Sequence, residues 1–122
     1  MAKIRQATKE DADKVGLTYS VNSLFWVWTE KKKKVFFSGF RRGNAMEIHL
    51  ASKNGKGRIG RAVDAFCKYL FKSYPWCQRI TGTLDNKNII ALSIKTGFKV
   101  IAEFPATVAG QHKILTLIER AR

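Results

Sequence analysis

Residues 45–73 read AMEIHLASKNGKGRIGRAVDAFCKYLFKS, and this stretch predicts the centre of the fold. Its first seven residues alternate in polarity, so that the apolar Met46, Ile48 and Leu50 share one face of a strand while polar residues share the other. After a glycine-rich segment, apolar residues recur at helical spacing and predict an amphipathic helix over about residues 58–73. The stretch therefore predicts a strand, a basic glycine-rich loop and a helix.

The loop runs from Asn54 to Arg61 and contains three glycines and three basic residues. Glycines allow positive φ and a close approach of the backbone, and a helix N-terminus offers unpaired N–H groups with a partial positive charge. The loop thus suits a phosphate or pyrophosphate group, to which Lys56, Arg58 and Arg61 add charged donors. A plain strand-to-helix turn with solvated charges is the alternative. The loop matches neither a Walker motif, because no Gly-Lys-Ser/Thr follows the glycines, nor the dinucleotide fingerprint, whose glycines are spaced differently.

Outward from this stretch, strands and helices alternate along the chain. The predicted elements are strands at 3–7, 78–84, 98–104 and 111–119, helices at 9–19 and 87–96, a hairpin over 24–40 and a loop over 105–110. The hairpin would carry a basic tip at residues 31–34, although a helix over 20–28 is an alternative. The resulting order, β-α-(β-β)-β-α-β-α-β-β, predicts one α/β (α+β) domain over residues 1–122 with a mixed sheet.

Charge is concentrated in one part of the chain. The formal net charge is +14, and residues 31–61 contain ten Lys or Arg against one acid. Such a field favours anionic partners, whether nucleotide phosphates, nucleic acid, acidic protein or membrane headgroups. Cys67 and Cys77 form no CxxC pair and have no histidine cluster nearby, so we expect reduced thiols and no metal. Without a signal sequence or a long apolar run, we expect a cytoplasmic protein and no membrane partner.

Three motifs, in this order, resemble those of the GNAT superfamily of N-acetyltransferases. Ile4 to Asp11 is similar to the family's first strand and the entry to its first helix, Gly55 to Val63 to its pyrophosphate loop, and Asn86 to Phe98 to its later Asn, short helix and Gly-Phe. The resemblance covers nearly the whole chain. It implies an acetyltransferase-type fold with a mostly antiparallel sheet, and acetyl-CoA as the cofactor. The short region before the loop strand is typical of a small, phage-type version of the fold.

The resemblance also implies where the cofactor binds. In the family, two central parallel strands splay apart, and backbone amides there hold the pantetheine arm and the thioester carbonyl. The implied cofactor-binding residues are Leu50, Ala51, Ser52, Gly55, Lys56, Gly57, Arg58, Ile59, Gly60, Arg61, Ala62 and Asn86. Two positions depart from the usual loop, because Arg58 is an extra residue and Asn54 replaces the leading Arg or Gln. Asn86 is equally expected to cap the helix that follows it.

Three residues are candidates for catalysis. Glu47 and His49 share the polar face of the strand before the loop, where a general base or a water chain is expected to deprotonate the attacking amine. Histidine ionises near neutral pH, whereas glutamate is the type that the family often places there; the alternative is that both are solvated strand residues. Ser93 stands where many members carry a Tyr that protonates the leaving thiolate, and its hydroxyl is a weaker acid.

These expectations combine into two candidate functions. The first is an acetyl-CoA-dependent N-acetyltransferase that acts on an amine of a protein or a small molecule. The basic surface would favour an acidic protein acceptor and repel polyamines. The second is a catalytically weakened form of the fold that binds nucleic acid or an acidic protein through the segment from Lys31 to Arg42. The sequence leaves the oligomeric state open.

Overall fold

The computed structural model describes residues 3–14, 24–53 and 58–122. Its elements are β1 (Lys3–Gln6), α1 (Lys9–Lys14), β2 (Leu24–Glu30), β3 (Lys33–Arg42), β4 (Ala45–Lys53), α2 (Ile59–Ser73), β5 (Arg79–Leu84), α3 (Lys87–Lys95), β6 (Lys99–Val108) and β7 (Gln111–Ala121). This order confirms the predicted α/β (α+β) class. Among the described helices, none has the length and apolar character that a membrane span requires.

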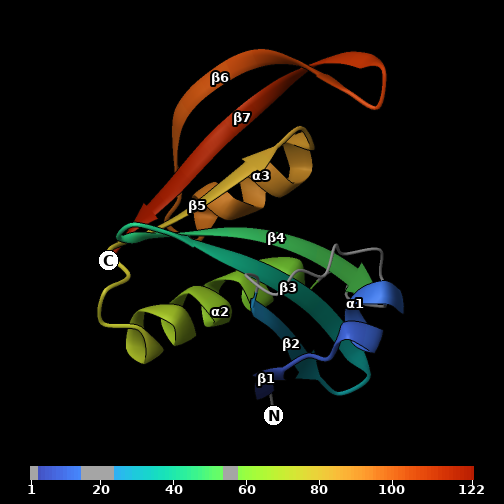
Figure 1. The fold of residues 1–122 in the computed structure, drawn as a ribbon, viewed down its shortest axis with the longest axis vertical. Helices are drawn as coiled ribbons and strands as arrows, with labels where there is room; N and C mark the ends of the chain where they lie inside the picture. Colours follow the sequence, from blue (N-terminus) through green and yellow to red (C-terminus); the bar gives the residue numbers. More distant parts are fainter. Residues whose placement is uncertain (1–2, 15–23, 54–57) are drawn as a thin grey trace.

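All seven strands belong to one sheet, in the order β1-β2-β3-β4-β5-β7-β6. Every neighbouring pair is antiparallel except β4 and β5, which run parallel, so the sheet is mixed and mostly antiparallel as expected. Figure 1 shows α2 lying along β3 and β4, and the long β6–β7 hairpin arching over α3. The one parallel pair is therefore at the centre of the sheet, next to both of these helices.

The predicted hairpin with a basic tip is present. Strands β2 and β3 pair from Leu24 to Glu30, and Lys31 and Lys32 form the turn between them, with a φ of 57° at Lys31. The alternative of a helix is wrong for residues 24–28, and residues 20–23 lie outside the described residues. The second half of the helix predicted over 9–19 also lies outside them.

The loop predicted over residues 105–110 is wrong for most of its length. Strand β6 continues through Pro105 to Val108, and only Ala109 and Gly110, both at positive φ, form the turn to β7. A central strand forms hydrogen bonds with a neighbouring strand along each edge, and proline has no N–H to donate to either. Because β6 is the outermost strand of the sheet, one set of its backbone groups has no neighbouring strand to bond, and proline is tolerated.

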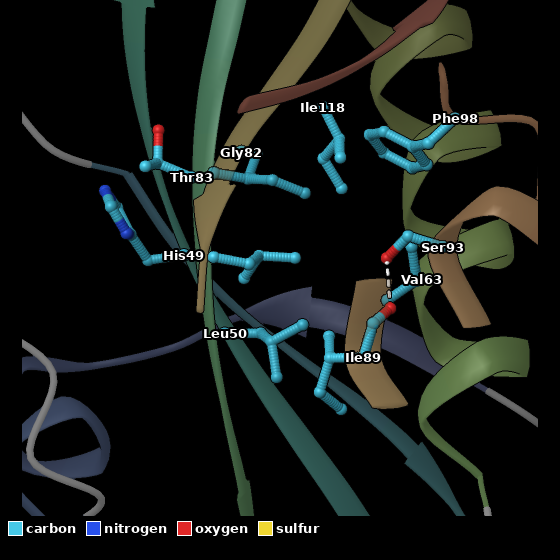
Figure 2. A pocket seen from close by; sticks show the side chains of 11 residues that line it. His49, Leu50, Val63, Gly82, Thr83, Ile89, Ser93, Phe98 and Ile118 are labelled. Atoms are coloured by element: carbon cyan, nitrogen blue, oxygen red, sulfur yellow. Dashed lines mark hydrogen bonds between the residues drawn. The ribbon is translucent and has the colours of Figure 1, made fainter. Parts of the chain in front are cut away.

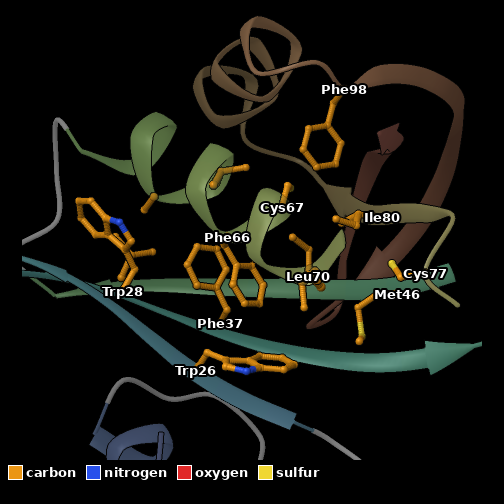
Figure 3. Close-up of a cluster of buried hydrophobic side chains, with 14 of the residues drawn as sticks. Trp26, Trp28, Phe37, Met46, Phe66, Cys67, Leu70, Cys77, Ile80 and Phe98 are labelled. Atoms are coloured by element: carbon orange, nitrogen blue, oxygen red, sulfur yellow. The ribbon is translucent and has the colours of Figure 1, made fainter. Parts of the chain in front are cut away.

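The hydrophobic core packs α2 against the sheet and so fixes the position of the helix relative to the strands. Phe66 of α2 stacks on Phe37 of β3, with ring centroids 4.1 Å apart, and tilts against Trp26 of β2 at 5.1 Å (Figure 3). Cys67 and Cys77 are buried as free thiols in the same core. Burial raises the pKa of the Cys67 thiol to about 12, so it stays protonated at neutral pH. The two cysteines are therefore packing residues of the core.

Candidate functional site

Strands β4 and β5 pair over only three residues and then separate. The parallel pairing begins at Ala45 and ends at Glu47, which lies opposite Thr81. From there β4 continues along β3, while β5 continues along β7. From Ile48 onward, the edge of β4 that faces β5 has no strand partner among the described residues. Its backbone N–H and C=O groups are consequently open to a ligand.

The separated strands form the two sides of a cleft of about 300 Å³. Residues of α2, α3 and β7 complete it, and Figure 2 shows their side chains converging on its interior. The lining residues are Ile48, His49, Leu50, Val63, Gly82, Thr83, Leu84, Ile89, Ser93, Phe98 and Ile118. Most of these side chains are apolar, so the cleft suits an extended, largely apolar chain whose few polar groups meet the free edge of β4.

Gly82 keeps the cleft open at its narrow end. A β-carbon at this position would lie 3.8 Å from the carbonyl oxygen of Ile48 and 3.8 Å from a side-chain carbon of Ile118. Any larger side chain would extend into the cleft. Gly82 belongs to none of the sequence motifs, although a glycine inside a strand often marks a close approach of another backbone or a ligand.

Leu50 is the residue of β4 whose backbone N–H best suits the expected role of a donor to the ligand. Residues two apart in a strand direct their backbone groups to the same edge, so the N–H of Leu50 lies on the same edge as the carbonyl of Ile48. Ala51 pairs with Phe36 of β3 on the other edge. Ser52 pairs with Val35, and its side chain lies outside the described residues.

Ser93 lies at the back of the cleft on α3 and is buried. Its hydroxyl donates a hydrogen bond to the backbone carbonyl of Ile89, with an oxygen–oxygen distance of 2.8 Å (Figure 2). The proton of this hydroxyl is thus already engaged. It has to rotate away from Ile89 before it can be donated to a ligand.

The two candidate bases are neighbours, but only one borders the cleft. His49 lines the cleft, whereas Glu47, at the last paired position of β4, does not. Nε2 of His49 lies 3.6 Å from Oε2 of Glu47, and Nη2 of Arg42 approaches the same oxygen at 3.5 Å. Glu47 therefore sits between two cationic or potentially cationic groups. It can orient the imidazole at the mouth of the cleft.

The N-terminus of α2 offers uncapped amides. Arg58 occupies the N-cap position without a capping hydrogen bond from its side chain, and the first turn contains no acidic residue. The amide of Ala62 bonds to the Arg58 carbonyl. Within the described part of the chain, the N–H groups of residues 59–61 have no hydrogen-bond partner, so they can bind an anion. Gly55, Lys56 and Gly57 lie outside the described residues.

Glu30, which no sequence motif marks as a site residue, interacts with both arginines of this region. Its carboxylate lies at the end of β2, is 11% exposed, and accepts a hydrogen bond from Nη2 of Arg61 at 2.9 Å. Nε of Arg58 lies 3.9 Å from the other carboxylate oxygen. Glu30 thus orients the two guanidinium groups and offsets part of their charge. Nothing in the local sequence links residues 30 and 61.

Asn86 caps α3, which is one of the two roles that the sequence predicted for it. Its side-chain oxygen accepts hydrogen bonds from the N–H groups of Asn88 at 2.9 Å and Ile89 at 3.1 Å. Any contact of this side chain with a ligand therefore has to come from its amide nitrogen.

The basic segment from Lys31 to Arg42 is not one surface. Its two ends are the opposite ends of β3, whose ten residues span roughly 30 Å. Arg41 stacks over the ring of Trp76 at 4.0 Å, and Arg42 pairs with Glu47. The basic turn at Lys31 instead lies near Arg58 and Arg61 at the start of α2, because the neighbouring Glu30 pairs with both arginines.

No protein-family model matches the chain, and no curated protein matches it significantly. Solved structures do. An IAA acetyltransferase from Bacillus cereus has a TM-score of 0.72 at 16% identity, covering 100% of both chains. An acetyltransferase from Bacillus subtilis in complex with CoA has a TM-score of 0.72 at 13% identity, covering 100% of this chain and 99% of that one. A spermidine/spermine N-acetyltransferase from Vibrio cholerae has a TM-score of 0.78 at 8% identity, covering 98% and 92%. The chain therefore has the fold of the GNAT superfamily of N-acetyltransferases.

Proposed function

We propose that this protein is an acetyl-CoA-dependent N-acetyltransferase. The observation that carries the proposal is the cleft between the separated strands, which Val63, near the start of α2, borders. A free strand edge suits the peptide-like amides of a pantetheine arm, and a bare helix N-terminus suits a pyrophosphate. A protein with the same fold, from Bacillus subtilis, has been solved with CoA bound.

Residues along the cleft and at the start of α2 support this ligand. The pantetheine arm would lie along the segment Leu50–Ser52, where the N–H of Leu50 faces the cleft. The pyrophosphate would meet the amides of residues 59–61 together with the glycine segment 55–57. Arg58 and Arg61 would supply charged donors, because a guanidinium has five N–H groups and Glu30 engages only part of them. The amide nitrogen of Asn86 would add a contact from the start of α3.

In the proposed reaction, acetyl-CoA supplies the acetyl group as a thioester. His49 would accept the proton of the acceptor amine, directly or through a water, and Glu47 would orient the imidazole. The N–H of Leu50 would donate to the reacting carbonyl oxygen and stabilise the negative charge that develops there. The Ser93 hydroxyl would turn from Ile89 toward the departing sulfur.

The acceptor is proposed to be an amine on a protein or a small molecule that is not a polycation. With a formal net charge of +14, the protein repels polyamines and attracts acidic molecules. A second candidate function rests on the basic turn at Lys31 and Lys32, which is exposed next to Arg58 and Arg61. In this alternative, the protein binds nucleic acid or an acidic protein and has weak or no transferase activity.

Isothermal titration with acetyl-CoA tests the proposal. We expect saturable one-to-one binding, followed by release of free CoA thiol when an amine acceptor is added. No heat at high micromolar acetyl-CoA would contradict it. Binding without transfer to any amine, combined with a salt-dependent gel shift of nucleic acid, would favour the second candidate.

A further inference from the structure

Glu30 continues the row of β2 side chains that packs under α2. Residues two apart in a strand share a face, so Trp26, Trp28 and Glu30 lie on the side of the sheet that α2 covers. Both tryptophans are fully buried there, and Trp26 tilts against Phe66 of the helix (Figure 3). Glu30 is the last residue of β2 and is 11% exposed. An acidic residue therefore ends an otherwise aromatic row.

A carboxylate with so little access to water is costly unless cations pair with it. Arg61 donates to Glu30 at 2.9 Å, and Nε of Arg58 lies 3.9 Å from its other oxygen. The first turn of α2 contains no acid, and Asp64, further along the helix, pairs with other basic residues. Within the described part of the chain, the ion pairs of both arginines are therefore with Glu30.

The chain around Glu30 is otherwise basic. Residues 24–42 contain six Lys or Arg, and Glu30 is their one acid. The turn that follows it, Lys31 and Lys32, is exposed. Across from it, the side chains of Arg58 and Arg61 are 34% and 61% exposed, and Glu30 engages only part of the five N–H groups of each guanidinium. Glu30 thus fixes the direction of two arginines and lowers the positive charge at the same point.

We propose that Glu30 determines which anions bind at the start of α2, an inference that rests on the proposed function. A simple polyanion gains its affinity from charge and can follow the arginines wherever they point. The phosphates of acetyl-CoA are tethered to a pantetheine arm in the cleft, so they depend on the direction of the arginines as well as on their charge. By lowering the charge and fixing the direction, Glu30 disfavours simple polyanions relative to the cofactor.

Titration calorimetry with inorganic tripolyphosphate and with acetyl-CoA tests this role. In Glu30→Gln, tripolyphosphate should bind about tenfold more tightly, because the positive charge rises. The affinity for acetyl-CoA should change by less than about threefold, since the added charge and the lost orientation of the arginines oppose each other. Glu103→Gln removes the same charge from an exposed position on β6 and should change neither affinity. Equal tightening of both anions in Glu30→Gln, or no tightening of tripolyphosphate, overturns the proposal.

Two further variants separate selection from a structural role. Glu30→Met has an apolar side chain of similar length that suits a mostly buried position, and it should shift the two affinities in the same way. A circular dichroism melt checks that the variants are folded. Weaker binding of both anions by a folded variant would mean that Glu30 only supports the structure, which overturns the proposal. Arg61→Gln should weaken tripolyphosphate binding more in the Glu30→Gln background than in wild type, because Glu30 no longer competes for the guanidinium. Equal effects in the two backgrounds also overturn it.

The same titrations distinguish failure of this inference from failure of the proposed function. Wild-type protein that binds no acetyl-CoA contradicts the proposed function and, with it, the selection by Glu30. Wild-type protein that binds acetyl-CoA, with the same ratio of the two dissociation constants as Glu30→Gln, leaves the proposed function standing and overturns only the role of Glu30.

Discussion

The hydroxyl of Ser93 donates its hydrogen bond to the carbonyl oxygen of Ile89, one turn earlier in α3, across 2.8 Å. In the structure, Ser93 therefore lines the cleft with its hydroxyl proton already bonded to the protein backbone. A thiolate is a good leaving group, and a hydroxyl that is already engaged is a weak source of the proton it needs.

Ser93→Ala should therefore reduce the rate of acetyl transfer by less than about tenfold, which corresponds to about 1.4 kcal/mol. Acetyl-CoA affinity, measured by titration, should stay unchanged. Ser93→Thr is the matched control, because it keeps the hydroxyl and should retain the wild-type rate if the added methyl group fits. A loss of a hundredfold or more in Ser93→Ala with unchanged affinity would identify the hydroxyl as an essential acid.

His49→Gln should reduce the transfer rate by about a hundredfold or more, in the range typical of losing a general base. Glu47→Gln should reduce the transfer rate by a smaller factor, because Glu47 acts through the imidazole rather than on the substrate. The measurement is kcat/KM of the three proteins with one amine acceptor at neutral pH. Equal values in all three proteins would remove both residues from the mechanism.

Gly82→Val should abolish acetyl-CoA binding while leaving the fold intact. A β-carbon at position 82 meets its nearest neighbours at 3.8 Å, which is an ordinary contact, but the branched side chain would fill the narrow end of the cleft. Valine also suits a strand, so the free energy of unfolding should change by about 1 kcal/mol or less. Titration calorimetry and a urea melt measure the two effects. Thr81→Val, at the last paired position of β5, is the control and should bind normally.

Arg61→Gln should weaken acetyl-CoA binding about tenfold, because it removes a charged donor beside the N-terminus of α2. Lys68→Gln removes the same charge from the same helix, seven residues further on, and should have little effect. If Arg61 contacts the 3′-phosphate, the difference between the variants should vanish with 3′-dephospho-CoA. Equal weakening in both variants would indicate a general effect of net charge.

Asp64→Asn should destabilise the protein at neutral pH and not in strong acid. Burial alone would raise the pKa of the Asp64 carboxyl, but hydrogen bonds and charges from Lys68 and Arg120 outweigh burial and lower it below its usual 3.8. A lowered pKa in the folded state adds stability above pH 3.8, and this contribution is lost as the pH falls through the folded-state value. Because Asp64 is partly solvated, the loss should be about 1 kcal/mol or less.

Urea melts of wild type and Asp64→Asn at neutral pH and near pH 3 check this prediction. The two curves should converge as the pH falls. Asp13→Asn, an exposed change on α1, is the control, and its urea melts should match those of the wild type at both pH values. A constant gap between wild type and Asp64→Asn at every pH would mean that packing rather than charge is responsible.

Local sequence determined most of the elements of this fold. The alternation of Met46, Ile48 and Leu50 and the helical spacing after Ile59 are periodicities, and each depends on which face of an element is buried. Gly97 ended α3 at positive φ and Asn86 began it, because these roles depend on the backbone of neighbouring residues only. The prediction for Pro105 failed, since its tolerance depends on β6 being the outermost strand.

Tertiary structure decided which of these residues meet. It separated Lys31 from Arg42 along β3, placed His49 rather than Glu47 on the cleft, and brought Glu30 to Arg61. These relationships depend on strand order and on where β4 and β5 part. Both follow from packing of the whole sheet against α2 and α3, which no short stretch of sequence encodes. The sequence by itself thus determined a basic glycine-rich loop between a strand and a helix, and only the folded sheet determined the cleft between β4 and β5.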